Sequence, residues 1–398
     1  MDKRQIADSV ERCLRWVETQ MLTFNRGTGG VYERIRINIG QRVCWTRPDC
    51  TSEMARAILL NHRVNGDDSR MDIYDNFINW LLKVQDTDEL SIWYGSFPFY
   101  RLDGWEDGGT GFARWQNDNG KVLIALLDMY ELTGDSRLLE SARHLADYWM
   151  GMQLPDGTYF RRDHCYTQAL HKGPCFVLWL IAGLQQCAAL TGDSTYRDSA
   201  RKALAYVLSL QQENGRFLTS YELHRSEDWR PVSSENAIAL FCLSRVMRFD
   251  PSDEVRAALE RVLGFVLTLQ HASGAVINCT PDSLGASLQE DPDLCDLVYT
   301  EGFALMGLTE VHRVLGDGAS LEAAKKLGTF LMRIQCQGES HLWDGAWRGS
   351  YNVVKDCWAG RADQNNPIDE GGMYSVYTGW CNAPILYGLL QLETLLDE

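Results

Sequence analysis

The chain has 398 residues, of which 45% are apolar, and it carries a formal net charge of −16. That length admits two ordinary domains, but a closed array of repeats can use it as one, so we expect a single domain over residues 1–398. An acidic chain lacks the Lys/Arg surface that nucleic acid requires, although a local Arg cluster can still bind an acidic small molecule.

The N-terminal segment MDKRQIAD has no apolar stretch of the kind found in signal peptides, and we expect no run of transmembrane length. The 12 cysteines form no CxxC pair. Most of them fall in apolar helical stretches, where a free Cys packs as a small hydrophobic residue. We therefore predict reduced cysteines, a cytoplasmic protein and no membrane partner.

One spacing recurs along the chain, in which an Asp is followed eighteen residues later by a Gln. The pairs are Asp67 and Gln85, Asp135 and Gln153, Asp193 and Gln211, Asp317 and Gln335, with Ser252 and Gln270 as a degenerate fifth copy. Self-similarity at a period of about 60 residues indicates an array of one supersecondary unit. We predict that each Asp caps a helix and that each Gln ties the following loop to the backbone.

Helical periodicity predicts twelve helices that alternate between an amphipathic and an apolar type. In chain order we expect amphipathic helices at 3–22, 69–85, 136–153, 194–212, 253–270 and 319–335, and apolar helices at 51–64, 118–132, 173–190, 234–247, 300–315 and 378–395. Six such hairpins can close into a ring with the apolar helices inside. The predicted fold class is all-α, an (α/α)6 barrel, with one small β-hairpin near residues 30–45 over a mouth.

The predicted loops differ in length at the two ends of the barrel. Links from an outer to an inner helix, at 23–50, 86–117, 154–172, 213–233, 271–299 and 336–377, are far longer than the links back. Long loops in compact domains usually carry function, and the inner-helix N-termini point their dipoles toward the same end. We expect the functional site at this mouth.

Asp118 stands at the predicted start of the second inner helix, between Asn117 and Asn119. A helix cap needs one such residue rather than three, so a catalytic carboxylate is favoured over a cap.

Glu235 and Glu301 occupy nearly the same place in later copies, where a preceding Ser or Thr can already cap the helix, and Asp49 occupies it in the first copy. For these three, a cap or a charge that compensates the helix dipole is the structural alternative. The candidate catalytic residues are Asp118, Asp49, Glu235 and Glu301.

Aromatic and Arg residues gather in the predicted mouth loops. Aromatic rings stack on the apolar faces of sugars, and Arg can hold a carboxylate or sulfate with two hydrogen bonds, so we predict a saccharide site that favours an acidic sugar. The candidate binding residues are Trp45, Arg47, Glu53, Trp115, Asn117, Asn119, His171, His224, Trp229, Arg230, Trp347, Arg348 and Trp380. The Asp163–Cys165 segment has no second pair at metal-ligand spacing, and no phosphate-binding loop is present, so we expect neither metal nor cofactor.

The pattern resembles the six-hairpin glycosidase superfamily, nearest to its unsaturated glucuronyl and rhamnogalacturonyl hydrolases. In those families an Asp begins an inner helix that runs to Thr-Gly-Asp, and Asp118 through Asp135 is similar; Asp49 matches their second Asp. The resemblance implies that Asp118 is a general acid/base with a second carboxylate as its partner. Those hydrolases usually open the fourth inner helix with Arg-Gly-x-Gly-Trp, whereas this chain has Trp229-Arg-Pro-Val-Ser-Ser-Glu235.

Three functions remain open at this point. The first is a glycoside hydrolase acting on an oligosaccharide that contains a uronic acid. The second is a lyase using His171, His224 or Tyr166, or a sugar epimerase, although the N-acylglucosamine 2-epimerases of this fold work through paired histidines. The third is a terpenoid-cyclase-like toroid, suggested by Gln153-x3-Gly157-x-Tyr159, or a non-catalytic sugar-binding protein.

Overall fold

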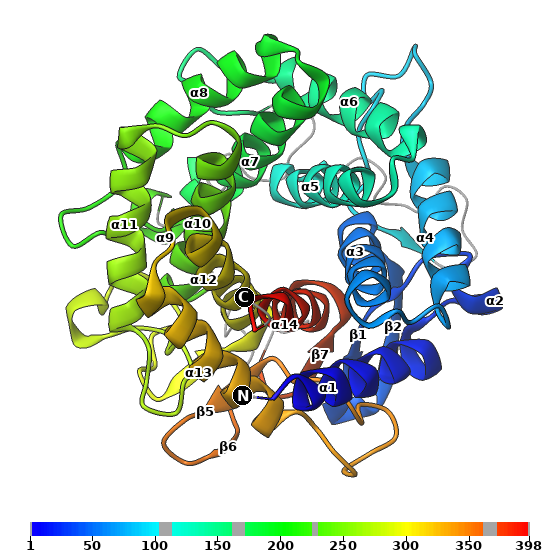
Figure 1. The fold of residues 1–398 in the computed structure, drawn as a ribbon, viewed down its shortest axis with the longest axis vertical. Helices are drawn as coiled ribbons and strands as arrows, with labels where there is room; N and C mark the ends of the chain where they lie inside the picture. Colours follow the sequence, from blue (N-terminus) through cyan, green and yellow to red (C-terminus); the bar gives the residue numbers. More distant parts are fainter. Residues whose placement is uncertain (1, 103–113, 161–171, 225–229, 361–371, 397–398) are drawn as a thin grey trace.

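A computed structural model describes residues 2–102, 114–160, 172–224, 230–360 and 372–396. An inner set of helices forms a closed ring (Figure 1). They are α3 (Pro48–Asn65), α5 (Gln116–Thr133), α7 (Pro174–Thr191), α10 (Val232–Phe249), α12 (Gly302–Leu315) and α14 (Ala383–Leu395). Each packs on the next in chain order, and α14 packs on α3, which closes the ring. The predicted (α/α)6 barrel is confirmed.

Six outer helices surround this ring. They are α1 (Lys3–Trp16), α4 (Met71–Val84), α6 (Ser136–Met150), α8 (Ser194–Leu208), α11 (Asp253–Thr268) and α13 (Gly318–Ile334). Three of the predicted helices differ from the sequence expectation because each includes a π-helical turn. These are η1 (Val17–Met21) after α1, η5 (Leu297–Glu301) before α12 and η6 (Thr378–Asn382) before α14. Short helices α2 (Phe24–Gly27) and α9 (Ser220–His224) and the 3-10 turns η2 (Ile37–Ile39) and η4 (Pro281–Ser283) lie in loops.

The repeated Gln is a structural tie, as predicted, and it reaches further than the loop. Gln153 Nε2 donates to Gly157 O at 3.0 Å and to Ser199 O of α8 at 2.8 Å, which links one hairpin to the next. Gly157 has φ +93°, and a Cβ there would lie 2.5 Å from Lys202 O. Gln85, Gln211, Gln270 and Gln335 make the same pair of bonds in their copies. The tie from Gln335 ends on Ser9 O of α1, so it closes the outer ring.

The predicted caps are confirmed at Asp135, Asp193, Ser252 and Asp317, whose side chains accept backbone N–H groups of the following helices. Asp67 differs, because α4 begins later, at Met71, and Asp67 instead accepts from Ser69 N.

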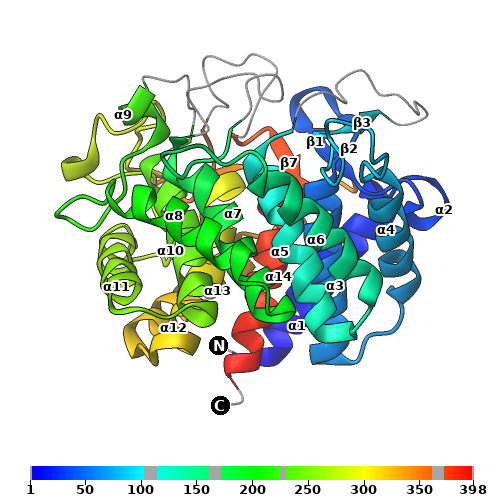
Figure 2. The ribbon, with the colours of Figure 1, turned by 90° about the horizontal axis from the view of Figure 1, so that it is seen from above.

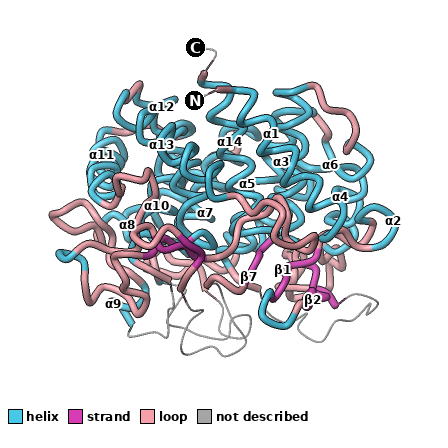
Figure 3. The backbone as a smooth tube through the Cα atoms, turned by 90° about the horizontal axis from the view of Figure 1, so that it is seen from below, coloured by secondary structure: helices cyan, strands magenta, loops and turns pink. Residues whose placement is uncertain are grey.

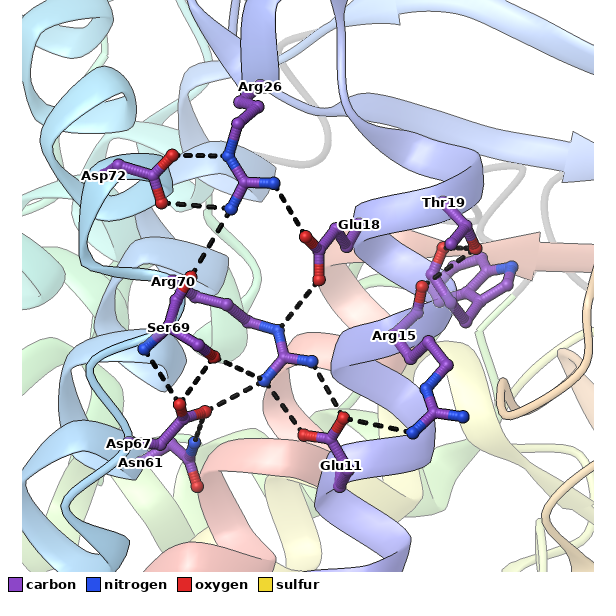
Figure 4. A network of polar contacts seen from close by, with 11 residues as sticks. Glu11, Arg15, Glu18, Thr19, Arg26, Asn61, Asp67, Ser69, Arg70 and Asp72 are labelled. Atoms are coloured by element: carbon purple, nitrogen blue, oxygen red, sulfur yellow. Dashed lines mark hydrogen bonds and ion pairs between the residues drawn. The ribbon is translucent and has the colours of Figure 1, made fainter.

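Asp67 belongs to a network of ion pairs between α1 and α4 (Figure 4). Arg70 contacts Asp67 and Glu11 at 2.9 Å each and Glu18 at 3.3 Å, while Arg26 bridges Glu18 and Asp72. This network joins the first outer helix to the second.

Two small sheets lie at one end of the barrel (Figures 2 and 3). The predicted hairpin is confirmed as β1 (Tyr32–Arg36) and β2 (Gln41–Thr46), and it extends to four strands in the order β3-β2-β1-β7, with β3 (Arg101–Leu102) and β7 (Ser375–Tyr377). The second sheet, β4 (Leu294–Asp296), β5 (Ser350–Asn352) and β6 (Cys357–Trp358), was not predicted. Strands of two or three residues are too short to show an alternating pattern. The long loops share this end, as expected, and both chain termini lie at the other (Figure 3).

One helix corrects an expectation from the sequence. Within the described ranges, α7 is long and apolar enough to cross a membrane by length and composition, but 83% of that window is buried in the barrel wall. Burial against neighbouring helices accounts for its composition. The cysteines that the structure describes are all free, as predicted.

Candidate functional site

The starts of α3 and α5 bring two predicted carboxylates together at the mouth. Arg47 is the extended residue before α3 (φ −120°), Pro48 begins the helix, and Asp49 lies in its first turn. Trp115 plays the same part before α5, with Asp118 in the first turn. Because α3 and α5 pack side by side, both carboxylates face one another at the same level of the ring.

Arg47 joins these carboxylates through one guanidinium group. Its Nε and Nη2 each donate to Asp49 at 3.0 Å, its Nη1 donates to Glu33 Oε1 at 2.8 Å, and its Nη2 lies 2.9 Å from Asp118 Oδ2. The guanidinium also covers the Phe99 ring, 4.5 Å from its centroid. Arg47 was predicted to contact substrate; with three carboxylates already bound to it, the geometry favours a role in positioning them.

The two aspartates have opposite electrostatic states. Burial raises the pKa of Asp118 to about 7, against the attraction of Arg47, and the negative charge of Asp49 adds to the rise. Burial also acts on Asp49, but there Arg47, Lys121 and hydrogen bonds outweigh it, and the pKa of Asp49 lies below its ordinary value. Near neutral pH, Asp118 therefore carries a proton on a large fraction of molecules while Asp49 is ionised.

Lys121 completes this cluster and was not among the predicted residues. Its ammonium lies 2.8 Å from Glu53, 3.4 Å from Asp49 and 3.3 Å from the centroid of the Trp380 ring. The signal was present in the sequence: a Lys stands one turn after Asp118 in a predicted inner helix, where a charged side chain is buried.

Trp380 contributes from η6, at the start of the last inner helix. Its indole Nε1 donates to Asp49 at 2.6 Å and its backbone N donates to Glu53 at 3.1 Å. It has φ +51°, a conformation that non-glycine residues adopt at an energetic cost and that is common in functional sites. The predicted residues Asp49, Asp118, Glu53, Arg47 and Trp380 thus form one cluster.

Glu235 and Arg230 lie apart from that cluster, at the start of α10. Glu235 accepts from Ser220 N at 2.8 Å, and Arg230 lies 3.6 Å from it and packs over Phe176. Asp296, which the sequence did not single out, is close by: burial raises its pKa to about 7, although its carboxylate accepts from Val298 N and Tyr299 N.

Glu301, Asn119 and Trp347 serve a second set of ties between loops and inner helices. Asn119 exchanges two hydrogen bonds with the backbone of Phe97, at 3.0 and 3.1 Å, and Glu301 accepts from Val276 N at 3.0 and 3.2 Å in the same place of its own copy. Trp347 is fully buried, and its backbone exchanges two hydrogen bonds with the Asn382 side chain before α14, at 2.9 and 3.1 Å, while its indole N–H donates to Leu331 O of α13. These contacts favour scaffold roles over catalysis or sugar binding.

The remaining predicted residues scatter over the mouth. Trp45 stacks on Tyr100 at 4.5 Å, Trp115 packs edge-on to Phe99, and Asn117 lies one residue before Asp118. His224 is exposed at the end of α9, and Arg348 pairs with Glu339 between two Trp rings. His171 and Trp229 lie outside the described residues, as does the segment from Asp163 to Cys165.

No family model matches the chain, and no curated protein matches it. Solved structures do. A sugar epimerase from a ruminal bacterium is 15% identical with a TM-score of 0.73, and the match covers 100% of this chain and 99% of that one. Cellobiose 2-epimerase from Bacillus thermoamylovorans B4167 is 10% identical at the same TM-score and coverage.

An unsaturated glucuronyl hydrolase specific for heparin is 12% identical with a TM-score of 0.67, over 99% of this chain and 97% of that one. Such identities establish a shared fold and leave the reaction to the residues of the site. The chain has the (α/α)6 barrel fold that these solved structures share.

Proposed function

We propose that this protein is a glycoside hydrolase that uses Asp118 as its general acid and Asp49 as an ionised partner. The observation that carries the proposal is the pair itself: two buried carboxylates on one guanidinium, with pKa values displaced in opposite directions. Two carboxylates in different protonation states are the usual requirement for protonating a glycosidic oxygen at neutral pH.

The site residues divide the reaction between them. Asp118 donates its proton to the departing oxygen, and the C–O bond breaks with its electron pair going to that oxygen. Water then adds to the sugar carbon as the new hydroxyl, and the proton that it loses returns to the Asp118 carboxylate. The negative charge of Asp49 stabilises the positive charge that develops on the sugar. Asp49 is itself held by Arg47, Lys121 and Trp380, which keeps it fixed and lowers its nucleophilicity.

The distance between the carboxylates bears on the route. Asp49 Oδ2 and Asp118 Oδ2 lie 3.0 and 2.9 Å from the same Arg47 nitrogen. The two oxygens are therefore less than about 6 Å apart, under the roughly 6.5–9.5 Å of inverting glycosidases, which must hold a water between their carboxylates. The same distance fits the roughly 5–5.5 Å of retaining pairs, but the donors that hold Asp49 make it a poor nucleophile. We therefore assign proton donation to Asp118 alone, which would serve either glycoside cleavage or the hydration of an unsaturated uronide.

An acidic sugar is the substrate class we favour. The hairpin β1–β2 that borders the cluster carries Arg36 and Arg42, both partly exposed. A basic border can attract a carboxylate in spite of the net charge of the whole chain.

The test is a screen of uronate-containing oligosaccharides, saturated and unsaturated, with wild type, Asp118→Asn and Asp193→Asn. Asp118→Asn should lower kcat by roughly 10²- to 10⁴-fold, the usual range for loss of a general acid. Asp193→Asn retains a helix cap on the outer wall and should leave kcat unchanged. Wild-type kcat/KM should fall as the pH rises through about 7, because Asp118 loses its proton there.

The products decide among the reactions. New reducing ends or the loss of an unsaturated uronide's ultraviolet absorbance would support hydrolysis. A new absorbance from a carbon–carbon double bond would mean elimination, and a product of unchanged mass would mean epimerisation. Full activity in Asp118→Asn would contradict the proposal whatever the product.

A further inference from the structure

Lys121 is a buried cation beside the site that makes and breaks no bond in the catalytic step above. Its side chain is 1% exposed, it lies on α5 one turn beyond Asp118, and it reaches across to carboxylates of α3. Burial disfavours an ammonium group unless anions compensate for the lost water. Here Glu53 at 2.8 Å and Asp49 at 3.4 Å provide the compensation, and the Trp380 ring covers the ammonium at 3.3 Å.

The two aspartates of the site differ in how many donors surround them. Asp49 receives two hydrogen bonds from Arg47, one from the Trp380 indole and a contact from Lys121. Asp118, in the described part of the chain, has one cation at contact distance, Arg47, at 2.9 Å. Lys121 is nearer to Asp118 in sequence but makes its contact with Asp49.

We infer that Lys121 is a positioning residue that keeps Asp49 ionised and in place, so that the proton of the site resides on Asp118. The inference rests on the proposed function, which supplies the role of the proton. It adds a specific arrangement: a lysine and a tryptophan that contact Oδ2 of the anionic aspartate, the same oxygen that Arg47 contacts.

The competing explanation is that Lys121 only neutralises Glu53. The charged groups that face Asp49 are Arg47 and Glu33 beside the hairpin, Lys121 and Asp118 on α5, and Glu53 on its own helix. Glu53 is the closer anion to Lys121, so removing Lys121 alone would leave Glu53 unpaired and could unfold the protein for that reason.

The experiment therefore uses Glu53→Gln as the reference and compares it with the double variant Lys121→Met/Glu53→Gln. Both lack the Glu53 charge, and they differ only in Lys121. Lys325→Met, which removes an exposed lysine paired with Glu322, is the matched control.

The first readout is the pH profile of kcat/KM. Removing Lys121 should raise the pKa of Asp49, so the acidic limb of the double variant should move up by about one pH unit or more relative to Glu53→Gln, with the limb unchanged in Lys325→Met. Superimposed acidic limbs in the double variant and its reference would show that Lys121 serves Glu53 alone, and would overturn the inference.

The second readout needs no substrate, so it stands even if the proposed function fails. The pKa of Asp49 is lowered in the folded protein, so its ionisation stabilises the fold above its ordinary pKa, and this contribution is lost as the pH falls through the folded value. At about pH 7, the Tm of the double variant should lie below the Tm of Glu53→Gln. This difference in Tm should become smaller toward about pH 4, where Asp49 gains a proton in the double variant. A gap in Tm independent of pH, or no gap, would overturn the inference.

Discussion

Two aspartates on the same helix, Asp118 and Asp128, sit in buried ionic clusters at opposite ends of α5 and behave in opposite ways. Toward the end of the ring away from the mouth, Asp128 pairs with Arg56 at 3.0 Å and with Arg245, and it accepts from Gln186 at 2.9 Å. Burial acts against its ionisation, but the two guanidinium groups prevail and the pKa of Asp128 lies below its ordinary value. At the mouth, the pKa of Asp118 rises to about 7.

The difference lies in the ratio of cations to carboxylates, because both groups are buried. Among the described residues, Asp128 is contacted by two guanidinium groups, whereas Asp118 shares one with Asp49 and Glu33. A buried acid with surplus positive charge binds helices together and stays ionised. A buried acid with too little positive charge holds a proton that it can donate.

The largest effect on stability should come from removing the carboxylate of Asp128, at the end of the ring away from the mouth. Asp128→Asn leaves Arg56 and Arg245 buried without their anion, so we expect the free energy of unfolding to fall by about 3–5 kcal/mol. Urea unfolding followed by circular dichroism measures this at neutral pH. A loss below about 1 kcal/mol would mean that the cluster does not bind the helices together.

At the mouth the corresponding change should be stabilising, by an amount that depends on pH. Because the folded-state pKa of Asp118 is raised, the folded protein holds a proton that the unfolded chain releases, and stability falls as the pH rises from about 4 to about 7. The side chain of Asp118→Asn cannot ionise. The free energy of unfolding of this variant should therefore exceed that of wild type by about 2–4 kcal/mol above pH 7 and by little near pH 4. Equal Tm differences at the two pH values would contradict the raised pKa.

The Gln ties are an uncharged counterpart to these two ionic clusters, so their contribution to stability should not depend on pH. Gln153→Ala removes the donor shared by Gly157 O and Ser199 O, and we expect a loss of about 1–3 kcal/mol in the free energy of unfolding at any pH from about 5 to about 8. Gln212→Ala is the control, since that side chain makes one long bond to Leu210 O. Equal losses in the two variants would rule out the tie as a source of stability.

The smallest effect should come from a helix cap, far from either cluster. Asp317 accepts from Ser320 N at 2.6 Å at the start of α13, and Asp317→Ala should destabilise the fold by about 1 kcal/mol. Asp317→Asn can still cap the helix, so its loss of stability should be much smaller when both variants are compared by thermal unfolding. Neither variant should alter kcat. A change in kcat would mean that the outer helices influence the reaction.

Local patterns were sufficient for most of the scaffold. The eighteen-residue spacing identified Asp135 as a cap and Gln153 as a tie, and the alternation of helix types predicted the ring and its mouth. Asp118 and Asp49 could be chosen because a first-turn carboxylate on an inner helix must face the mouth. The short strands and the π-helical turns were missed, since two to five residues carry too little periodicity.

Only the tertiary structure decided what each mouth residue does. In the sequence, Glu301 and Glu235 occupy positions equivalent to that of Asp118. In the structure, however, Glu301 accepts a hydrogen bond from Val276 N, whereas Asp118 shares the Arg47 guanidinium with Asp49. Lys121 acquired its place only when α3 and η6 were packed against α5. Helical periodicity is set by neighbours along the chain and can be recognised there. Protonation is set by burial and by charges from distant segments, so the same carboxylate in the same helical turn becomes a tie, an ion-pair partner or an acid according to what the fold brings against it.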